Sequence, residues 1–74
     1  MAEKTSNVIA ITLNGEPHEL EREVSVMRLV ESLKVKLSRV AVELNQEVVP
    51  KARYEDTIIR AGDVVEVINF VGGG

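Results

Sequence analysis

The sequence predicts an α+β fold, a mixed sheet of four to five strands with one helix packed across it. Three observations predict this fold. Apolar and polar residues alternate toward both ends of the 74-residue chain, which is typical of strands with one buried face. Between these segments the apolar period switches once to that of a helix. An Asn-Gly pair follows the first alternating segment, and this dipeptide is the strongest short signal for a two-residue hairpin turn.

The first alternating segment predicts a hairpin. The residues expected on its buried face are Ile9, Ile11 and Leu13. A turn at Asn14-Gly15 would reverse the chain into a second strand over residues 16–22. Because Pro17 has no backbone N–H to donate to a ladder, we expect this second strand to lie at an edge of the sheet.

The helix is predicted from an apolar stripe at positions i, i+3, i+4 and i+7. Its members are Val26, Leu29, Val30 and Leu33. Ser25 is placed to cap the N-terminus, and Val24 is placed to pack on Leu29 as a hydrophobic staple. Since no glycine closes the stripe, the sequence predicts an end only somewhere in residues 34–37.

Alternation returns after the helix. The residues expected to face inward there are Val40, Val42 and Leu44. Asn45-Gln46 predicts a tight turn into a short strand over 47–49, which Pro50 would end. Residues 51–56 have no clear period, and we expect an irregular or single-turn segment there, anchored by Ile58 and Ile59.

The last strand is predicted to begin after Gly62-Asp63. Val65 and Val67 share one of its faces, and Glu66, Ile68 and Phe70 share the other. A right-handed crossover through the helix would place this strand centrally, beside the first. This arrangement is a β-grasp. We therefore expect a flexible N-terminal segment over 1–7, a β-grasp domain over 8–71 and a flexible glycine tail over 72–74.

Composition argues against several function classes. The net charge is −3 and aromatic residues make up only 3% of the chain, so we expect no nucleic-acid partner. No apolar run approaches the ~20 residues of a membrane span, and the first seven residues lack the apolar stretch of a secretory signal. Cysteine is absent, which excludes disulfides and thiol catalysis and fits a cytoplasmic location.

Side-chain catalysis is not expected either. His18 has no nucleophile constellation around it, and a lone histidine is most often a spectator. Glu19, Glu21 and Glu23 alternate along the chain at the predicted edge strand, a pattern more typical of a solvated edge than of a metal site. We therefore expect no metal and no bound cofactor.

The sequence ends in Val71-Gly72-Gly73-Gly74, directly after the last predicted strand. One interpretation is an inert terminal linker. The other is a tail that enters a partner's channel, because glycine has no side chain to limit how closely the channel walls approach. Four extended residues reach about 13 Å. The reactive group would then be the Gly74 carboxylate, which ATP-dependent adenylation could activate so that a sulfur nucleophile displaces AMP and leaves a thiocarboxylate.

Two segments resemble a known family. Residues 40–50 (VAVELNQEVVP) and 62–74 (GDVVEVINFVGGG), together with Asn14-Gly15, resemble the thiamin-biosynthesis sulfur carriers of the ThiS family. The resemblance covers about residues 8–74, and Gln46 departs from it where glycine is common. It implies a ubiquitin-like β-grasp fold and a carrier rather than an enzyme, ending in the Gly-Gly pair matched by Gly73 and Gly74.

The resemblance also implies partners. A ThiF-like adenylating enzyme would use ATP on Gly74, a sulfur-donating protein would supply sulfur, and thiazole synthase would use the thiocarboxylate for the thiazole ring of thiamin. Gly72 and Gly73 would lie in the partner's channel. Two alternatives stay open, namely the small subunit of molybdopterin synthase and a non-covalent β-grasp interaction module. The ending VEVINFVGGG favours the thiamin branch.

A partner must also contact the globular body. Ile68 and Phe70 stand next to the tail, and an exposed aromatic beside an aliphatic is a plausible anchor. In the alternative interpretation, Phe70 folds back over the end of the core. Glu43 and Glu66 are placed to guide a partner electrostatically, although charges at this density usually only solubilise a surface.

Overall fold

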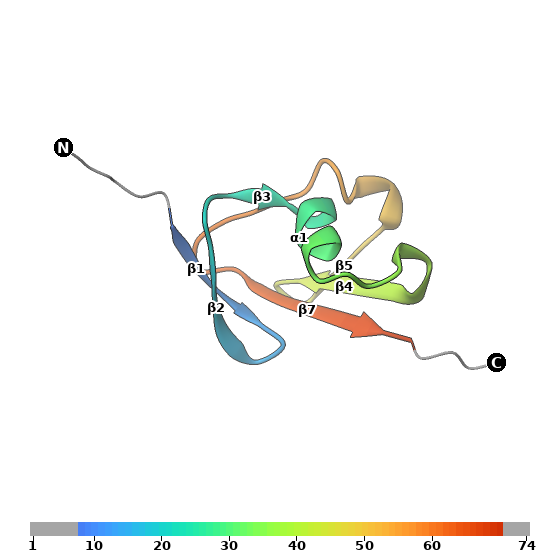
Figure 1. Cartoon of the computed structure of the whole chain (residues 1–74), viewed down its shortest axis with the longest axis horizontal. Helices are drawn as coiled ribbons and strands as arrows, with labels where there is room; N and C mark the ends of the chain where they lie inside the picture. The colour runs from blue at the N-terminus through green and yellow to red at the C-terminus, as the bar shows by residue number, and fades with distance from the viewer. Residues whose placement is uncertain (1–7, 71–74) are drawn as a thin grey trace.

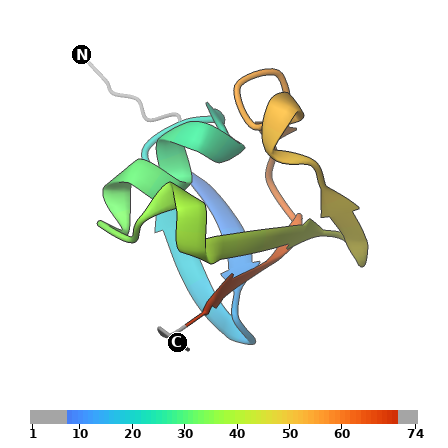
Figure 2. The same cartoon turned by 90° about the vertical axis from the view of Figure 1, so that its right-hand side faces the viewer.

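A five-stranded mixed sheet with one helix across it forms the body of the protein (Figures 1 and 2). The computed structural model describes residues 8–70. The strands, in their order across the sheet, are β2 (Glu16–Leu20), β1 (Ile9–Leu13), β7 (Val64–Asn69), β4 (Val40–Leu44) and β5 (Glu47–Val49). The helix α1 (Val26–Ser32) packs on one face. The predicted β-grasp arrangement is confirmed.

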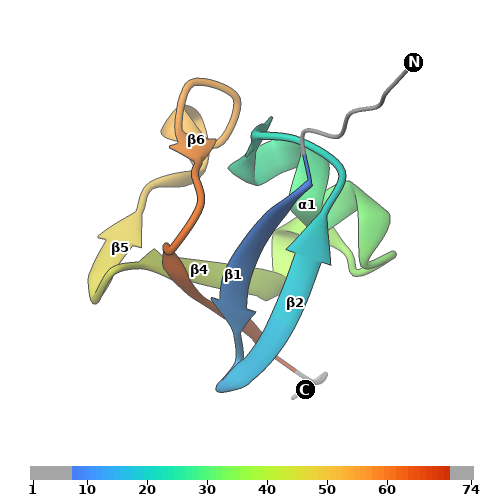
Figure 3. The same cartoon turned by 90° about the vertical axis from the view of Figure 1, so that its left-hand side faces the viewer.

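The last strand lies at the centre of the sheet, as predicted. β7 runs parallel to β1, with Thr12 opposite Val64 and Leu13 opposite Val65. On its other side β7 runs antiparallel to β4 over five residue pairs. Figure 3 shows the β1–β2 hairpin on one side of the molecule and β5 on the other. A central strand is held by ladders on both sides, so the segment leading to the tail starts from a firmly anchored element.

The β1–β2 hairpin has the predicted turn. Asn14 and Gly15 take φ values of 52° and 83°, as a type I′ turn requires. β2 is an edge strand, as Pro17 predicts, but it ends at Leu20 and not at Arg22. The predicted extension is wrong because Leu20 already pairs with Ile9, the first residue of β1, and beyond it β1 offers no partner.

A second, two-stranded sheet was not predicted. β3 (Val24–Ser25) pairs antiparallel with β6 (Ile58–Ile59). Strands of two residues are too short to show alternation, so the sequence indicated only a staple at Val24 and an anchor at Ile58 and Ile59.

The helix begins where predicted and ends early. The Ser25 side chain accepts a hydrogen bond from the Arg28 backbone N–H at 3.1 Å, which confirms the cap. The helix ends at Ser32, before the predicted range. Lys34 then takes a φ of 61°, the left-handed conformation that usually falls to glycine after a helix. A short 3₁₀ helix, η1 (Leu37–Arg39), leads into β4.

The core lies between α1 and the inner face of the sheet. Its buried members are Ile11, Val26, Leu29, Val30, Val40, Val42, Val49, Tyr54, Ile59 and Val65. All but Val49 and Tyr54 were expected from the periodicity or as anchors. Tyr54 follows the 3₁₀ helix η2 (Lys51–Arg53) and is only 1% exposed. Because residues 51–56 have no period, the sequence did not indicate which of them points inward.

Candidate functional site

The three glycines of the predicted site lie outside the described residues, as do Val71 and the predicted N-terminal segment 1–7. The structure therefore describes the platform from which the tail leaves, and not the tail. This platform consists of β7, its neighbours on both sides and the surface around Phe70.

Two turn asparagines hold β7 from opposite sides. Asn14 Oδ1 accepts from the Val67 N–H at 2.8 Å, and Asn45 Oδ1 accepts from the Val64 N–H at 2.9 Å. Both asparagines have positive φ, which asparagine tolerates better than most residues. Their backbone N–H groups also donate to β7, from Asn14 to Val65 O and from Asn45 to Val64 O, at 2.9 and 2.7 Å. Each hairpin turn is thus bonded to the strand that precedes the tail.

Both ends of β7 are also fixed. Before the strand, the Asp63 carboxylate accepts from the Arg60 N–H at 2.8 Å and from Asn45 Nδ2 at 3.1 Å. After it, the Phe70 N–H donates to Arg39 O at 2.7 Å. The backbone is therefore hydrogen-bonded up to Phe70, the last residue described.

The predicted anchor residues Ile68 and Phe70 are both on the surface. Ile68 is 43% exposed and Phe70 57%. Phe70 does not fold back over the core. It lines a groove of about 240 Å³ with Lys34, Val35, Lys36, Arg39 and Asn69. The positive charge beside Phe70 was not predicted. Lys34, Lys36 and Arg39 fall within six residues of sequence, and this spacing could have indicated a basic groove.

The part of β4, β5 and β7 that points away from the core is called the outer face below. It consists of alternate residues on three strands, Ala41, Glu43, Val48, Val64, Glu66 and Ile68. Val48 and Val64 are 68% and 42% exposed. Glu43 and Glu66, predicted to guide a partner, lie directly opposite each other in this face.

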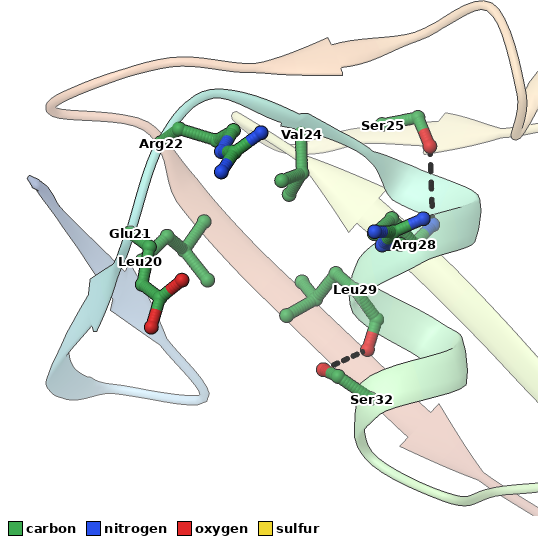
Figure 4. A pocket seen from close by; sticks show the side chains of 8 residues that line it. All are labelled: Leu20, Glu21, Arg22, Val24, Ser25, Arg28, Leu29 and Ser32. Atoms are coloured by element: carbon green, nitrogen blue, oxygen red, sulfur yellow. Dashed lines mark hydrogen bonds between the residues drawn. The ribbon is translucent and has the colours of Figure 1, made fainter. Parts of the chain in front are cut away.

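Another groove lies beside α1, and the two serine hydroxyls in it form hydrogen bonds within the helix. It measures about 470 Å³ and lies between the end of β2 and α1 (Figure 4). The Ser25 hydroxyl in it caps the helix, and the Ser32 hydroxyl donates to Leu29 O at 2.7 Å. Both hydroxyls thus serve the helix itself, and no predicted site residue lines this groove.

The single histidine of the chain lies in an edge strand of the sheet. His18 is half-buried in β2 opposite Ile11. Over residues 8–70 there is no cluster of three or more acidic or histidine side chains that could hold a metal ion. In that same part of the chain, no helix is long and apolar enough to cross a membrane.

Known proteins match both the sequence and the fold. The model of the ThiS family matches residues 11–74. The sulfur carrier protein ThiS of Thermus thermophilus is 41% identical over 64 residues, which cover 86% of this chain and 98% of that protein. A crystal structure of the thiamine biosynthesis protein ThiS from Geobacter metallireducens superposes with a TM-score of 0.77 at 36% identity, covering 89% of this chain and all of that one.

A thiazole synthase of Paramagnetospirillum magneticum is also 38% identical over 64 residues, but the chain spans only 20% of that protein's length. The family match covers most of the chain, and the central β7 and both Asn turns lie inside it. With matching fold, length and sequence, the chain belongs to the ThiS family of thiamin-related sulfur carriers.

Proposed function

We propose that this protein carries sulfur as a thiocarboxylate on Gly74 and donates it for the thiazole ring of thiamin. The main support is the family match over residues 11–74, which includes all three tail glycines. The hydrogen-bonded platform supports it too, because a tail leaving a fixed strand has a defined point of departure. The proposal requires a free carboxylate at Gly74.

The chemistry has two steps, and both take place at the C-terminal carboxyl group of Gly74. A carboxylate oxygen attacks the α-phosphorus of ATP on a ThiF-like adenylating enzyme, and pyrophosphate leaves. Hydrosulfide, released from a sulfur-donating protein with a thiol as the reductant, then attacks the acyl carbon, and AMP leaves with the bonding electrons. The protein has no cysteine, so this sulfur comes from outside the chain. Thiazole synthase would receive it.

Intact-mass spectrometry tests the proposal. The protein is incubated with the adenylating enzyme, ATP and a sulfide source, and we expect the mass change of one oxygen replaced by sulfur, located at Gly74 by fragmentation. Omitting ATP should abolish the change. An unchanged mass, with an enzyme that modifies another ThiS protein in the same assay, would favour the non-covalent module.

Molybdopterin synthesis is the second candidate, because its small subunit would use the same tail chemistry. The two pathways are separated by complementation. We expect the gene to rescue a thiazole-requiring strain and not a molybdenum-cofactor-deficient strain. The opposite pattern would assign the protein to molybdopterin synthesis.

Ile68 and Phe70 are proposed as the apolar anchor for the adenylating enzyme. Phe70→Ala should raise the KM for the carrier about tenfold or more, as removal of an interface aromatic typically does, while the unfolding midpoint stays within error. Val8→Ala is the matched control, because Val8 is also an exposed apolar residue, at 49%, but lies just before β1. Equal effects of the two substitutions would contradict the anchor.

A further inference from the structure

The outer face contains two carboxylates at one position of the sheet. In the antiparallel pairing of β4 with β7, Glu43 lies directly opposite Glu66. Directly opposite residues have Cβ atoms about 4.5–5.5 Å apart, and like charges at such positions destabilise a sheet. The arrangement therefore costs the isolated protein stability.

The two glutamates differ in burial, and neither is hydrogen-bonded through its carboxylate within residues 8–70. On its other side Glu43 is opposite Val48 of β5, and Glu43 is half-buried while Glu66 is exposed. No hydrogen bond from another residue in 8–70 reaches either carboxylate. As far as residues 8–70 are concerned, both groups therefore keep their capacity to accept hydrogen bonds from a partner.

The neighbours of the acidic pair are apolar. Ile68 is the next outward residue of β7 on one side of Glu66, and Val64 is the next on the other. Val48 adds the most exposed large apolar side chain of the described residues, at 68%. The outer face is thus an acidic centre with an apolar rim.

Arginine is the side chain that fits this face best. Its planar guanidinium has five N–H donors and can bond two carboxylates at once, whereas lysine is a compact and strongly hydrated point charge. The apolar stem of arginine would lie along the rim. A guanidinium bonded to both carboxylates would give complementarity that neither carboxylate supplies alone.

We propose that the outer face binds a protein surface that inserts an arginine between Glu43 and Glu66, with apolar side chains around it. This inference rests on the proposed function, because the partner is taken to be a protein that acts on the tail. The arginine replaces the repulsion between the two carboxylates with two charge-assisted hydrogen bonds.

The test uses two measurements that should move in opposite directions. Glu66→Gln removes the repulsion and should raise Tm by about 1–5 °C. The same change should weaken binding to the adenylating enzyme or to thiazole synthase roughly tenfold or more, measured by calorimetry at physiological salt. Glu43→Gln should behave alike. A merely solubilising pair would move neither binding constant.

Glu66→Lys sharpens the test, because it places a cation opposite Glu43 within the protein itself. It should raise Tm and remove the partner's site in one step. Glu31→Gln is the control, since Glu31 is an exposed residue of α1 and the change in net charge is the same as in Glu66→Gln. Binding of both partners at wild-type strength by the Glu43 and Glu66 variants, or a loss equal to that of Glu31→Gln, would overturn the proposal.

This outcome is separable from that of the proposed function. At saturating adenylating enzyme, Glu66→Gln should still form the thiocarboxylate at the wild-type kcat. If the wild-type protein forms no thiocarboxylate but its binding depends on both glutamates, the sulfur chemistry is wrong and the docking face stands. If the thiocarboxylate forms and binding is indifferent to both, only the docking inference fails.

Discussion

At the scale of single residues, two turns with the same backbone shape differ in one side chain. Gly15 and Gln46 each occupy the second position of a turn with two positive φ values, 83° and 73° respectively. An L side chain costs roughly 1–2 kcal/mol in this conformation, whereas glycine adopts it freely. Gln46 therefore adds strain to a turn that Asn45 otherwise fixes to β7.

Exchanging the residue types should change stability in opposite directions. Gly15→Ala should lower the free energy of unfolding by about 1–2 kcal/mol, and the cost is purely conformational because a Cβ there meets nothing within 4 Å. Gln46→Gly should raise the free energy of unfolding by up to about 1 kcal/mol, since the entropy of glycine offsets part of the relief. Urea unfolding measures both. A Gln46→Gly variant less stable than the wild type would contradict the strain.

Tyr54 should give the protein a pH dependence at the alkaline end. Burial raises the pKa of its hydroxyl above the ordinary value of 10.0, and a backbone hydrogen bond at Val42 opposes this in part. The unfolded chain then loses its proton at lower pH than the folded protein. The stabilisation by neutral Tyr54 is complete below about pH 10 and is lost as pH rises from there through the higher pKa of the folded state.

The Tyr54→Phe variant isolates this effect. Its free energy of unfolding should fall less steeply than that of the wild type as the pH rises above about 10, because lysine titration is common to both proteins. At neutral pH the variant should lose about 1 kcal/mol with the hydrogen bond. Parallel pH profiles in urea unfolding would contradict the assignment.

At the scale of elements, β7 depends on side chains of distant turns. The bond from the Val67 N–H to Asn14 Oδ1 spans 53 positions of sequence. Asn14→Gly keeps the turn conformation and removes the acceptor, so it should cost about 1 kcal/mol. Amide exchange at Val67 should accelerate more than exchange in α1. Asn14→Asp retains an acceptor and is the control; equal acceleration in both variants would show that the side-chain bond is unimportant.

The same elements show what the sequence can and cannot predict. The helix and the inward faces of β1, β4 and β7 follow from periodicity, because burial on one face leaves a direct pattern. The exposure of Ile68 follows from the same alternation. In contrast, the Asn-Gly pair predicts a turn but not that Asn14 also holds β7, since that contact exists only after the chain has folded.

Register between distant strands is likewise a tertiary property. The sequence predicts that Glu43 and Glu66 are each on the surface. It does not predict that they lie opposite each other, because that depends on how β4 and β7 align. The left-handed Lys34 has the same explanation, because no local signal marks a lysine for a position that glycine usually fills.

At the scale of the whole molecule, stability and the proposed chemistry are assigned to different parts of the chain. Every residue of the buried core lies between Ile11 and Val65, and the last described hydrogen bond of the backbone is at Phe70. The residues proposed to react follow after that point. The body can therefore be altered for stability, and the tail for chemistry, with little effect of one on the other.

Removal of Gly73 and Gly74 tests this separation. The shortened protein should unfold at the same urea concentration as the full chain, because the change touches no core residue. It should form no thiocarboxylate with the adenylating enzyme and should fail to rescue a thiazole-requiring strain. A variant with two added glycines serves as the control for length and should also be inactive, since its carboxylate would overshoot the reacting position by about 7 Å. Rescue by the shortened chain would mean that sulfur is held elsewhere.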